Sequence, residues 1–499
     1  MTSLSIPRTF GLSRSTITPA LIVFFGGANL ILIQWVLVRE LTTLLLGTEL
    51  VTLLVTISYF LGLSLGYGLA RRIRRAWLIP LAVITLILHL SLPIWFRLVV
   101  TGLDSMGLYA LTFLVLPALV PLIISSFYSV FLPLLVDSGE GQLPVLYGVE
   151  LLGSICGVMI LFLLGGLGLQ TVFVFYAMGL LLILAALKIQ PLPLVALAIM
   201  SVVWLLILPS ANKWSNAIWY MQIHNLPSRT TTLFSSYSAY QKVDVLQGIG
   251  GERYLFLDGL EHFGGVDGSQ LNVILGRIPA QLLQPENALV IGAGSMEMAA
   301  MIADSAGQVT TVEIDPLVVN SSLRYFDSVN QMSSLDNRRI VIDDAKHYIA
   351  NTSDRYDLVS TDTPAAYAIQ TATLYSASFY QAIAAHLNPG GVLAANLTSS
   401  FAPDDEVSRR IAASLLTAFD EVIVVTSQAA GWSFAYASDD LPFDRAAIEN
   451  ALRASGETGF VIFDTPAVRA VVGDARPITL DSMDIVLHIS LDWIQDRWN

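Results

Sequence analysis

The sequence predicts an α-helical membrane bundle of about seven spans, followed by a small β-subdomain and an α/β domain of the Rossmann type. Three observations lead to this fold class: long apolar runs confined to the first part of the chain, a short region of alternating polarity after them, and a strand, glycine turn, helix and strand near residue 290. We place the membrane part at 1–212, a connector and β-subdomain at 213–270, and the α/β domain at 271–499.

Composition separates the two halves of the chain. Charged residues make up 13% of the 499 positions, whereas soluble domains average about 25%, so part of the chain is expected to face lipid. Residues 1–212 hold nine Lys/Arg and six Asp/Glu, while the remainder holds 17 and 33, a net charge of −16. So acidic a domain is a poor partner for nucleic acid. No Cys/His cluster has metal-ligand spacing, so no metal is expected.

Seven apolar runs are long enough to cross a bilayer. They are Thr18–Val38, Leu53–Ala70, Trp77–Phe96, Met106–Val136, Leu146–Leu167, Thr171–Leu187 and Leu192–Leu208. The fourth fits one tilted helix or two short ones, so eight spans are the alternative. Glu40 lies near the end of the first run, either at the membrane interface or at a polar site inside the bundle.

A pattern typical of nucleoside-binding βαβ units follows in the acidic half. A buried strand (Leu289–Ile291) enters a turn containing Gly292 and Gly294, a helix follows, and a second strand (Val309–Val312) ends on Glu313. Glycines let the backbone approach a ligand, and an acidic residue about 20 positions on can accept both ribose hydroxyls.

Two further carboxylates stand at predicted strand ends. Ile340–Ile342 ends in Asp343-Asp344, and Tyr356–Ser360 ends near Asp362. Ligands of such sheets bind beyond the carboxyl ends of the strands. Asp344 is therefore expected either to accept from an adenine amino group or to cap the next helix. Asp362 is expected either to act as a base or charge stabiliser, or only to start a turn.

Flanking regions are less informative. Ser215–Asn225 is interpreted as a connector, and Tyr240–Leu246 and Arg253–Leu257 as strands of the β-subdomain. The pattern of Phe401–Asn499 predicts a helix, two strands and an acidic tail, without recognisable chemistry.

With these residues assembled, the soluble half resembles the spermidine synthase (polyamine aminopropyltransferase) family from about Tyr240 to Leu397. The hydrophobic half is similar to the membrane extension of some members. The motifs that carry the resemblance, in order, are Tyr240-Gln241, Leu257-Asp258-Gly259, Leu289–Gly294, Val312–Pro316, Asp343-Asp344-Ala345, Tyr356-Asp357, Leu374-Tyr375-Ser376, Phe379-Tyr380 and Leu387–Val392.

The resemblance implies an adenosyl-sulfonium co-substrate: decarboxylated S-adenosylmethionine (AdoMet) in the family proper, or intact AdoMet in methyltransferase relatives. By motif position, Glu313 contacts the ribose, Asp344 the adenine, and Asp362 takes the place of the catalytic aspartate. The implied site residues are Asp362 and Tyr375 as catalytic groups, and Gln241, Gly292, Gly294, Ser295, Glu313, Asp344 and Ala345 as cofactor-binding groups.

The sequence departs from the family pattern in the acceptor half of the site. The family turn is Gly-Gly-Gly-Asp-Gly, whose aspartate holds the ammonium of the aminopropyl arm, and Ser295 occupies that position here. The family's Asp-x-x-Asp pair becomes Asp362-Thr363-Pro364-Ala365, so the second, diamine-binding carboxylate is missing.

Three functions remain open at this point. The first is aminopropyl transfer to an amine. The second is methyl transfer from AdoMet to a membrane-associated or unusual acceptor, which Ser295 favours because it removes repulsion against a cofactor carboxylate. The third is a non-catalytic protein that binds or transports a nucleoside or polyamine. The family also implies a homodimer that pairs through the β-subdomain.

Two arguments predict opposite orientations of the chain in the cell membrane. Arg8, Arg14 and the four arginines between 71 and 75 flank the first two runs, so the positive-inside rule puts the N-terminus in the cytoplasm. Seven spans then place the soluble domain outside and eight place it inside. Because nucleoside co-substrates are cytoplasmic, we expect the soluble domain on the cytoplasmic side.

Overall fold

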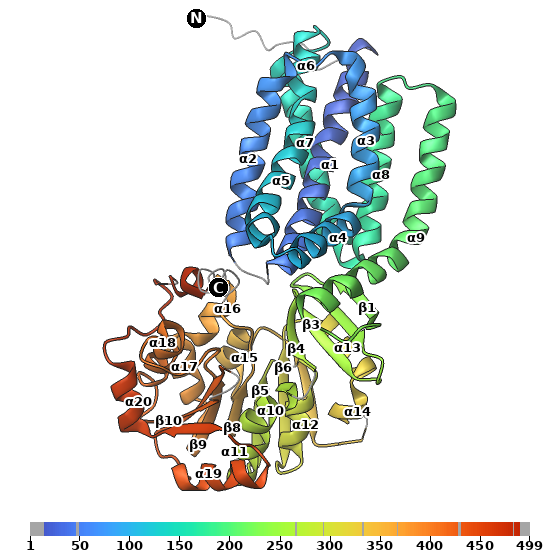
Figure 1. Ribbon diagram of the computed structural model, residues 1–499. Helices are drawn as coiled ribbons and strands as arrows, with labels where there is room; N and C mark the ends of the chain where they lie inside the picture. Colours follow the sequence, from blue (N-terminus) through green and yellow to red (C-terminus); the bar gives the residue numbers. More distant parts are fainter. Residues whose placement is uncertain are drawn as a thin grey trace, which may run out of the picture. The chain divides into compact units, whose positions relative to one another are not determined.

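A computed structural model describes residues 14–45, 49–264, 267–292, 294–331, 334–366, 368–427, 431–482 and 484–489. The chain forms two compact units. We call residues 1–41 and 51–226 the helical unit, and residues 42–50 and 227–499 the α/β unit (Figure 1).

The helical unit is built from apolar helices, most of them long (Figure 1). They are α1 (Arg14–Leu44), α2 (Leu50–Ala70), α3 (Leu78–Leu90), α4 (Leu92–Ser105), α5 (Leu116–Ser129), α6 (Phe131–Asp137), α7 (Leu143–Leu164), α8 (Leu169–Ala186) and α9 (Pro191–Ile223). The stretch Ser215–Ile223, predicted to begin a connector, instead continues α9. Its aromatic residues pack inward, which explains their abundance: Trp219 and Tyr220 are buried.

Six helices among the described residues are long and apolar enough to cross a membrane, by length and composition alone. A seventh candidate is the pair Arg75–Leu90 and Leu92–Ser105, which bends by 70°. The bend has a local cause: Ser91 Oγ donates to Ile87 O at 2.7 Å, and Pro93 has no N–H with which to continue α3. Leu111–Asp137 forms one candidate span, so no described helix supplies the eighth crossing.

Glycines let the helices of this unit pack closely. A Cβ atom on Gly62 or Gly66 of α2 would lie 2.3 Å from Leu122 O or 2.2 Å from Ser126 O of α5. A Cβ atom on Gly153 of α7 would lie 1.9 Å from Phe24 O of α1. Close backbone approach at small residues is the usual way in which helices pack in lipid.

A buried ion pair joins three helices of the unit. Arg97 of α4 donates from Nη2 to Glu40 Oε1 of α1 at 2.6 Å, and from Nε to Glu40 Oε2 at 2.9 Å. Its Nη1 donates to Asn212 Oδ1 of α9 at 2.7 Å. Both charged side chains are at most 1% exposed. The alternative that places Glu40 at a polar site inside the bundle is therefore correct.

The α/β unit begins with a four-stranded antiparallel sheet in the order β1-β2-β3-β4. The strands are β1 (Thr231–Tyr237), β2 (Lys242–Gln247), β3 (Arg253–Leu257) and β4 (Leu260–Phe263). The two predicted strands correspond to β2 and β3, and the sheet contains two more at its edges.

The main sheet has eight strands in the order β12-β10-β11-β9-β8-β5-β6-β7. β5 to β9 are parallel, whereas β10, β11 and β12 join in antiparallel fashion. After β7 the chain crosses β5 to form β8, so the order reverses between β5 and β8, and ligands of doubly wound sheets bind at such a point. The strands are β5 (Asn287–Ile291), β6 (Gln308–Glu313), β7 (Arg338–Ile342), β8 (Tyr356–Thr361), β9 (Leu387–Asn396), β10 (Glu421–Ser427), β11 (Ser433–Ser438) and β12 (Phe460–Phe463).

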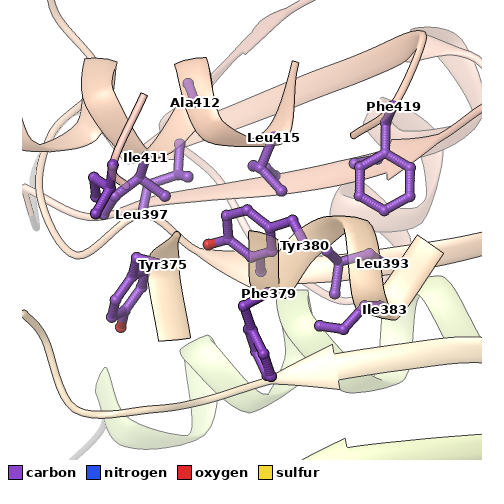
Figure 2. Packing of buried hydrophobic residues seen from close by; sticks show 14 of the residues in the cluster. Tyr375, Phe379, Tyr380, Ile383, Leu393, Leu397, Ile411, Ala412, Leu415 and Phe419 are labelled. Atoms are coloured by element: carbon purple, nitrogen blue, oxygen red, sulfur yellow. The ribbon is translucent and has the colours of Figure 1, made fainter. Parts of the chain in front are cut away.

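Helices cover both faces of this sheet. Alternate residues of β5 point to opposite sides: Leu289 and Ile291 join one buried cluster, Ala288 and Val290 the other. Figure 2 shows the first cluster, where Tyr380 of α17 lies near Leu415 of α18. The helices are α10 (Asp267–Asn272), α11 (Ile278–Leu283), α12 (Glu297–Ala303), α13 (Pro316–Tyr325), α14 (Asp327–Asn330), α15 (Ala345–Asn351), α16 (Ile369–Ala372), α17 (Ala377–Ala384), α18 (Glu406–Leu415), α19 (Arg445–Ala454) and α20 (Thr465–Val472).

The prediction for Phe401–Asn499 is partly wrong. This region contains three strands and three helices among its described residues, rather than one helix and two strands. Most of it is an integral edge of the main sheet.

Candidate active site

A cavity of about 580 Å³ opens at the carboxyl ends of β5, β6, β7 and β8. Residues of the β-subdomain form part of its wall, and the turns after the four strands form the rest. Seven of the nine predicted site residues line it: Gln241, Gly292, Gly294, Glu313, Asp344, Ala345 and Asp362. Residues far apart in the sequence thus come together at one end of the sheet.

The turn after β5 requires glycine at position 292. Its φ is +91°, and a Cβ atom there would lie 2.2 Å from Asp362 O. Gly292 N donates to Val312 O at 3.0 Å, which fixes the turn against the end of β6. At Gly294 the Cβ position is open space, so the backbone can approach a ligand there.

Glu313, at the end of β6, lies in the wall with 8% of its surface exposed. Its Oε1 accepts from Asp315 N at 2.9 Å, so one carboxylate oxygen is held against the turn. Asp315 in turn accepts from Leu317 N at 2.9 Å and caps α13. The carboxylate is thereby fixed in orientation before any ligand binds.

Gln241 is positioned by the same turn. Ser238 Oγ donates to Asp315 Oδ2 at 2.6 Å, and Gln241 Nε2 lies 3.4 Å from the same oxygen. Gln241 N also donates to Ser238 Oγ at 3.0 Å. The β1–β2 turn is therefore tied to the start of α13, which brings the β-subdomain to the cavity wall beside the end of β6.

Asp344 caps the helix that follows it. Its Oδ1 accepts from Lys346 N at 2.8 Å and from His347 N at 3.4 Å. The capping interpretation is therefore confirmed. Asp344 also lines the cavity together with Ala345, so a contact to adenine stays a prediction.

Asp362 follows β8, where its backbone N donates to Ile291 O at 3.0 Å. No described residue donates a hydrogen bond to its carboxylate. Burial raises the pKa of the Asp362 carboxyl to about 6. A carboxylate with a raised pKa, in a cavity and without an ion-pair partner among the described residues, is a candidate base for a reacting group.

Tyr375 does not line the cavity. Its ring is buried. Its hydroxyl donates a hydrogen bond to Thr363 O at 2.9 Å and accepts one from Thr363 Oγ1 at 3.1 Å. These contacts hold the backbone directly after Asp362. The geometry thus gives Tyr375 a positioning role, and nothing places its hydroxyl beside a reacting group.

Ser295 does not line the cavity either. It is 4% exposed, and its Oγ accepts from Glu297 N at 3.3 Å at the start of α12. Glu297 is also buried and accepts from Asn272 Nδ2 at 2.7 Å. Ser295, which occupies the position of the family's ammonium-binding aspartate, therefore faces the protein interior.

His262 was missed from the sequence as a site residue, although it lines the cavity from β4. Burial lowers the pKa of its imidazole to about 4, so it is neutral near pH 7. Neither a motif nor its spacing marks this histidine, because β4 is an edge strand of four residues that periodicity does not reveal.

A family model matches the middle of the α/β unit. Residues 264–442 match the family model described as a spermine/spermidine synthase domain. The matched residues lie in the α/β unit and make up just over a third of the chain. The resemblance inferred from the motifs is confirmed.

Similar proteins include a polyamine aminopropyltransferase of Oceanobacillus iheyensis, 32% identical over 32% of this chain and 33% of its own length. Another, from Thermoplasma acidophilum, is 29% identical over 34% of this chain and 63% of its own length. The chain thus spans a third to just under two thirds of these relatives. A crystal structure of a probable spermidine synthase from Corynebacterium glutamicum is similar with 19% identity and a TM-score of 0.41, over 49% of this chain and 94% of that one.

Proposed function

We propose that the chain is an integral membrane aminopropyltransferase that moves the aminopropyl group of decarboxylated AdoMet to an amine acceptor. One observation carries the proposal: the cavity gathers Asp362, Glu313 and the Gly292 turn at the carboxyl ends of three neighbouring strands. The names of the relatives support the same reaction class.

The nucleoside is assigned to the end of the cavity formed by β5, β6 and β7. Glu313 accepts the ribose hydroxyls, the Gly292–Gly294 turn allows close backbone approach, and Asp344 and Ala345 meet the adenine. Asp344 Oδ1 is occupied by the capping hydrogen bond, so Oδ2 accepts from the adenine amino group.

Asp362 acts at the reacting centre. The lone pair of a neutral amine attacks the carbon beside the sulfonium; the new N–C bond forms as the C–S bond breaks, and the electron pair of that bond stays on sulfur as a thioether. The proton lost by the amine passes to the Asp362 carboxylate. Because the pKa of this carboxyl is raised to about 6, it is ionised at pH 8 and a stronger base than an exposed aspartate. No described group of His, Cys, Asp and Glu is arranged to hold a metal ion.

The helical unit anchors the enzyme in the cell membrane. Six apolar helices and one bent pair have the length and composition of spans. An alkaline carbonate wash of membranes should leave the full chain in the pellet. Release into the supernatant would contradict the assignment.

The division of the chain into 1–212, 213–270 and 271–499 belongs to this proposal, as does a homodimer that pairs through the β-subdomain. Mass photometry of the detergent-solubilised protein should give twice the mass of one chain plus its micelle. A single-chain mass at all concentrations would contradict the dimer.

The reaction is tested with the purified full-length protein in detergent. It is incubated with a set of amines and either decarboxylated AdoMet or AdoMet, and products are identified by mass spectrometry. We expect amines that gain one aminopropyl group, together with the thioether nucleoside. Amines that gain a methyl group, from AdoMet only, would establish the methyltransferase alternative. Donor binding without any transfer would favour a non-catalytic binding protein.

A further inference from the structure

We propose that the acceptor has one ionisable amine and an uncharged remainder, rather than a second ammonium group. The inference rests on the proposed function and concerns the same cavity. It follows from how the carboxylates of the cavity wall are engaged.

Five carboxylates stand among the described residues that line the cavity. Four of them accept hydrogen bonds from backbone N–H groups at 2.8–2.9 Å: Asp258 from Lys242, Glu313 from Asp315, Asp343 from Asp344, and Asp344 from Lys346. These four hold turns and helix ends in place through one oxygen each. The proposed function assigns the remaining oxygens of Glu313 and Asp344 to the nucleoside, and Asp343 Oδ2 lies 2.9 Å from His347 Nδ1. Asp362 alone has no such bond from a described residue, and the reacting amine occupies it.

The wall that continues from Asp362 is uncharged. Thr363, Pro364 and Ala365 follow it directly in the lining, and Ala368, Thr371 and Leu374 come next. The hydroxyl of Thr371 lies 3.0 Å from both Ala365 O and Ala368 O, so its proton is used within the loop. No described residue from Thr363 to Leu374 in this wall can ion-pair with an ammonium.

The other titratable groups in the wall do not supply the missing negative charge. His262 is a neutral imidazole near pH 7. Lys346 is cationic, with its Nζ donating to Thr373 Oγ1 at 2.8 Å, and it repels a second ammonium. An ammonium removed from water without a carboxylate partner is costly to bury, whereas a hydroxyl or alkyl group is not.

The first test compares acceptors of equal length. The purified full-length enzyme receives decarboxylated AdoMet with 1,4-diaminobutane, 4-aminobutan-1-ol or n-butylamine. We expect kcat/KM for at least one of the two monoamines to exceed that for the diamine by tenfold or more. A diamine preferred over both monoamines overturns the inference.

The second test introduces the missing charge. Ala365→Asp places a carboxylate on the wall three residues after Asp362, and Ala365→Asn is the matched uncharged control. The aspartate variant should raise the ratio of diamine to monoamine kcat/KM by tenfold or more, while the asparagine variant leaves it unchanged. The inference is overturned if Ala365→Asp and Ala365→Asn have the same ratio of diamine to monoamine kcat/KM while calorimetry shows that both variants bind the thioether nucleoside.

Failure of this inference is distinguishable from failure of the proposed function. Aminopropyl transfer that favours the diamine overturns only the inference. Absence of transfer to all three amines, with the donor bound, overturns the proposed function and the inference with it.

Discussion

The orientation and the raised pKa of Asp362 follow from its position beside the carboxyl ends of β5 and β8. Its backbone N donates a hydrogen bond to Ile291 O, and its carbonyl oxygen would lie 2.2 Å from a Cβ atom on Gly292. The side chain therefore projects into the cavity from a rigid position, and burial there raises its pKa. A buried carboxylate in a catalytic position commonly costs stability, because its ionised form loses hydration.

Replacing the carboxylate by an amide removes the base. Asp362→Asn should lower kcat by about 10²–10⁴-fold, the range for loss of a general base. The Kd of decarboxylated AdoMet should change by less than about threefold, because the nucleoside contacts proposed above lie on other residues. Rates and calorimetry on the same preparation check both values, and full activity of the variant would refute the assignment.

The same substitution should stabilise the fold. The folded-state pKa of Asp362 is raised, so at neutral pH its ionised form destabilises the folded state, and this cost disappears as the pH falls through 6 toward 3.8. Asp362→Asn should therefore add about 1–2 kcal/mol to the stability of the α/β unit at pH 7.5. Thermal unfolding at pH 7.5 and pH 5 checks this: the gain should shrink at the lower pH, and a loss at pH 7.5 would contradict it.

Activity should follow the protonation of this group. As the pH falls below about 6, Asp362 becomes protonated and kcat should decline about tenfold per pH unit. The profile of kcat under saturating substrates measures this limb. The residual activity of Asp362→Asn should not show this decline below about pH 6.

At the scale of elements, the sequence predicted buried parts better than edges. Strands β5, β6 and β8 were located within two residues, because buried parallel strands are continuous apolar runs bounded by turn residues. β1 and β4, the two edge strands of the small sheet, were missed, whereas β7, an edge strand of the main sheet, was located. Glu313, Asp344 and Asp362 were placed correctly at strand ends because the strands before them were located.

Motif position located residues but not the directions of their side chains. Ser295 and Tyr375 lie next to the cavity in sequence, yet both side chains are buried in other contacts. The side chain of Ser295 bonds within its own turn, and that of Tyr375 points back to Thr363. Such directions depend on tertiary packing, which a linear pattern does not contain.

The ion pair of α4 and α1 gives a prediction about helix packing. Arg97→Met removes the guanidinium from the buried Glu40 carboxylate and should cost about 3–5 kcal/mol. Arg75→Met is the control, because Arg75 pairs with Glu140 at the surface and should cost less than about 1 kcal/mol. Thermal aggregation in detergent compares the two, and equal midpoints would contradict a structural role for the buried pair.

For the whole molecule, the count of crossings decides which side the active site faces. Arg75 and Glu140 are in contact, so the loops after α2 and before α7 lie at the same end of the helical unit. If the helical unit spans a membrane as proposed, an even number of crossings separates these two loops. The bent α3–α4 pair then counts as one crossing beside Leu111–Asp137, and the total is seven. An odd number of crossings puts the start of α1 and the end of α9 on opposite sides of the proposed membrane.

We predict that the α/β unit faces the cytoplasm, where nucleoside co-substrates are made, although the arginines between 71 and 75 favour the opposite orientation. A fluorescent protein fused after residue 499 should fluoresce in a bacterial host, and alkaline phosphatase at the same position should be inactive. Active phosphatase would place the cavity outside the cell and contradict a cytoplasmic donor.

The most direct test of the central claim is calorimetric binding of decarboxylated AdoMet and of AdoMet to the purified full-length protein, followed by product analysis with amines. We predict tighter binding of the decarboxylated donor and amines extended by one aminopropyl group. Tighter binding of AdoMet with methylated products, or no binding of either, would contradict it.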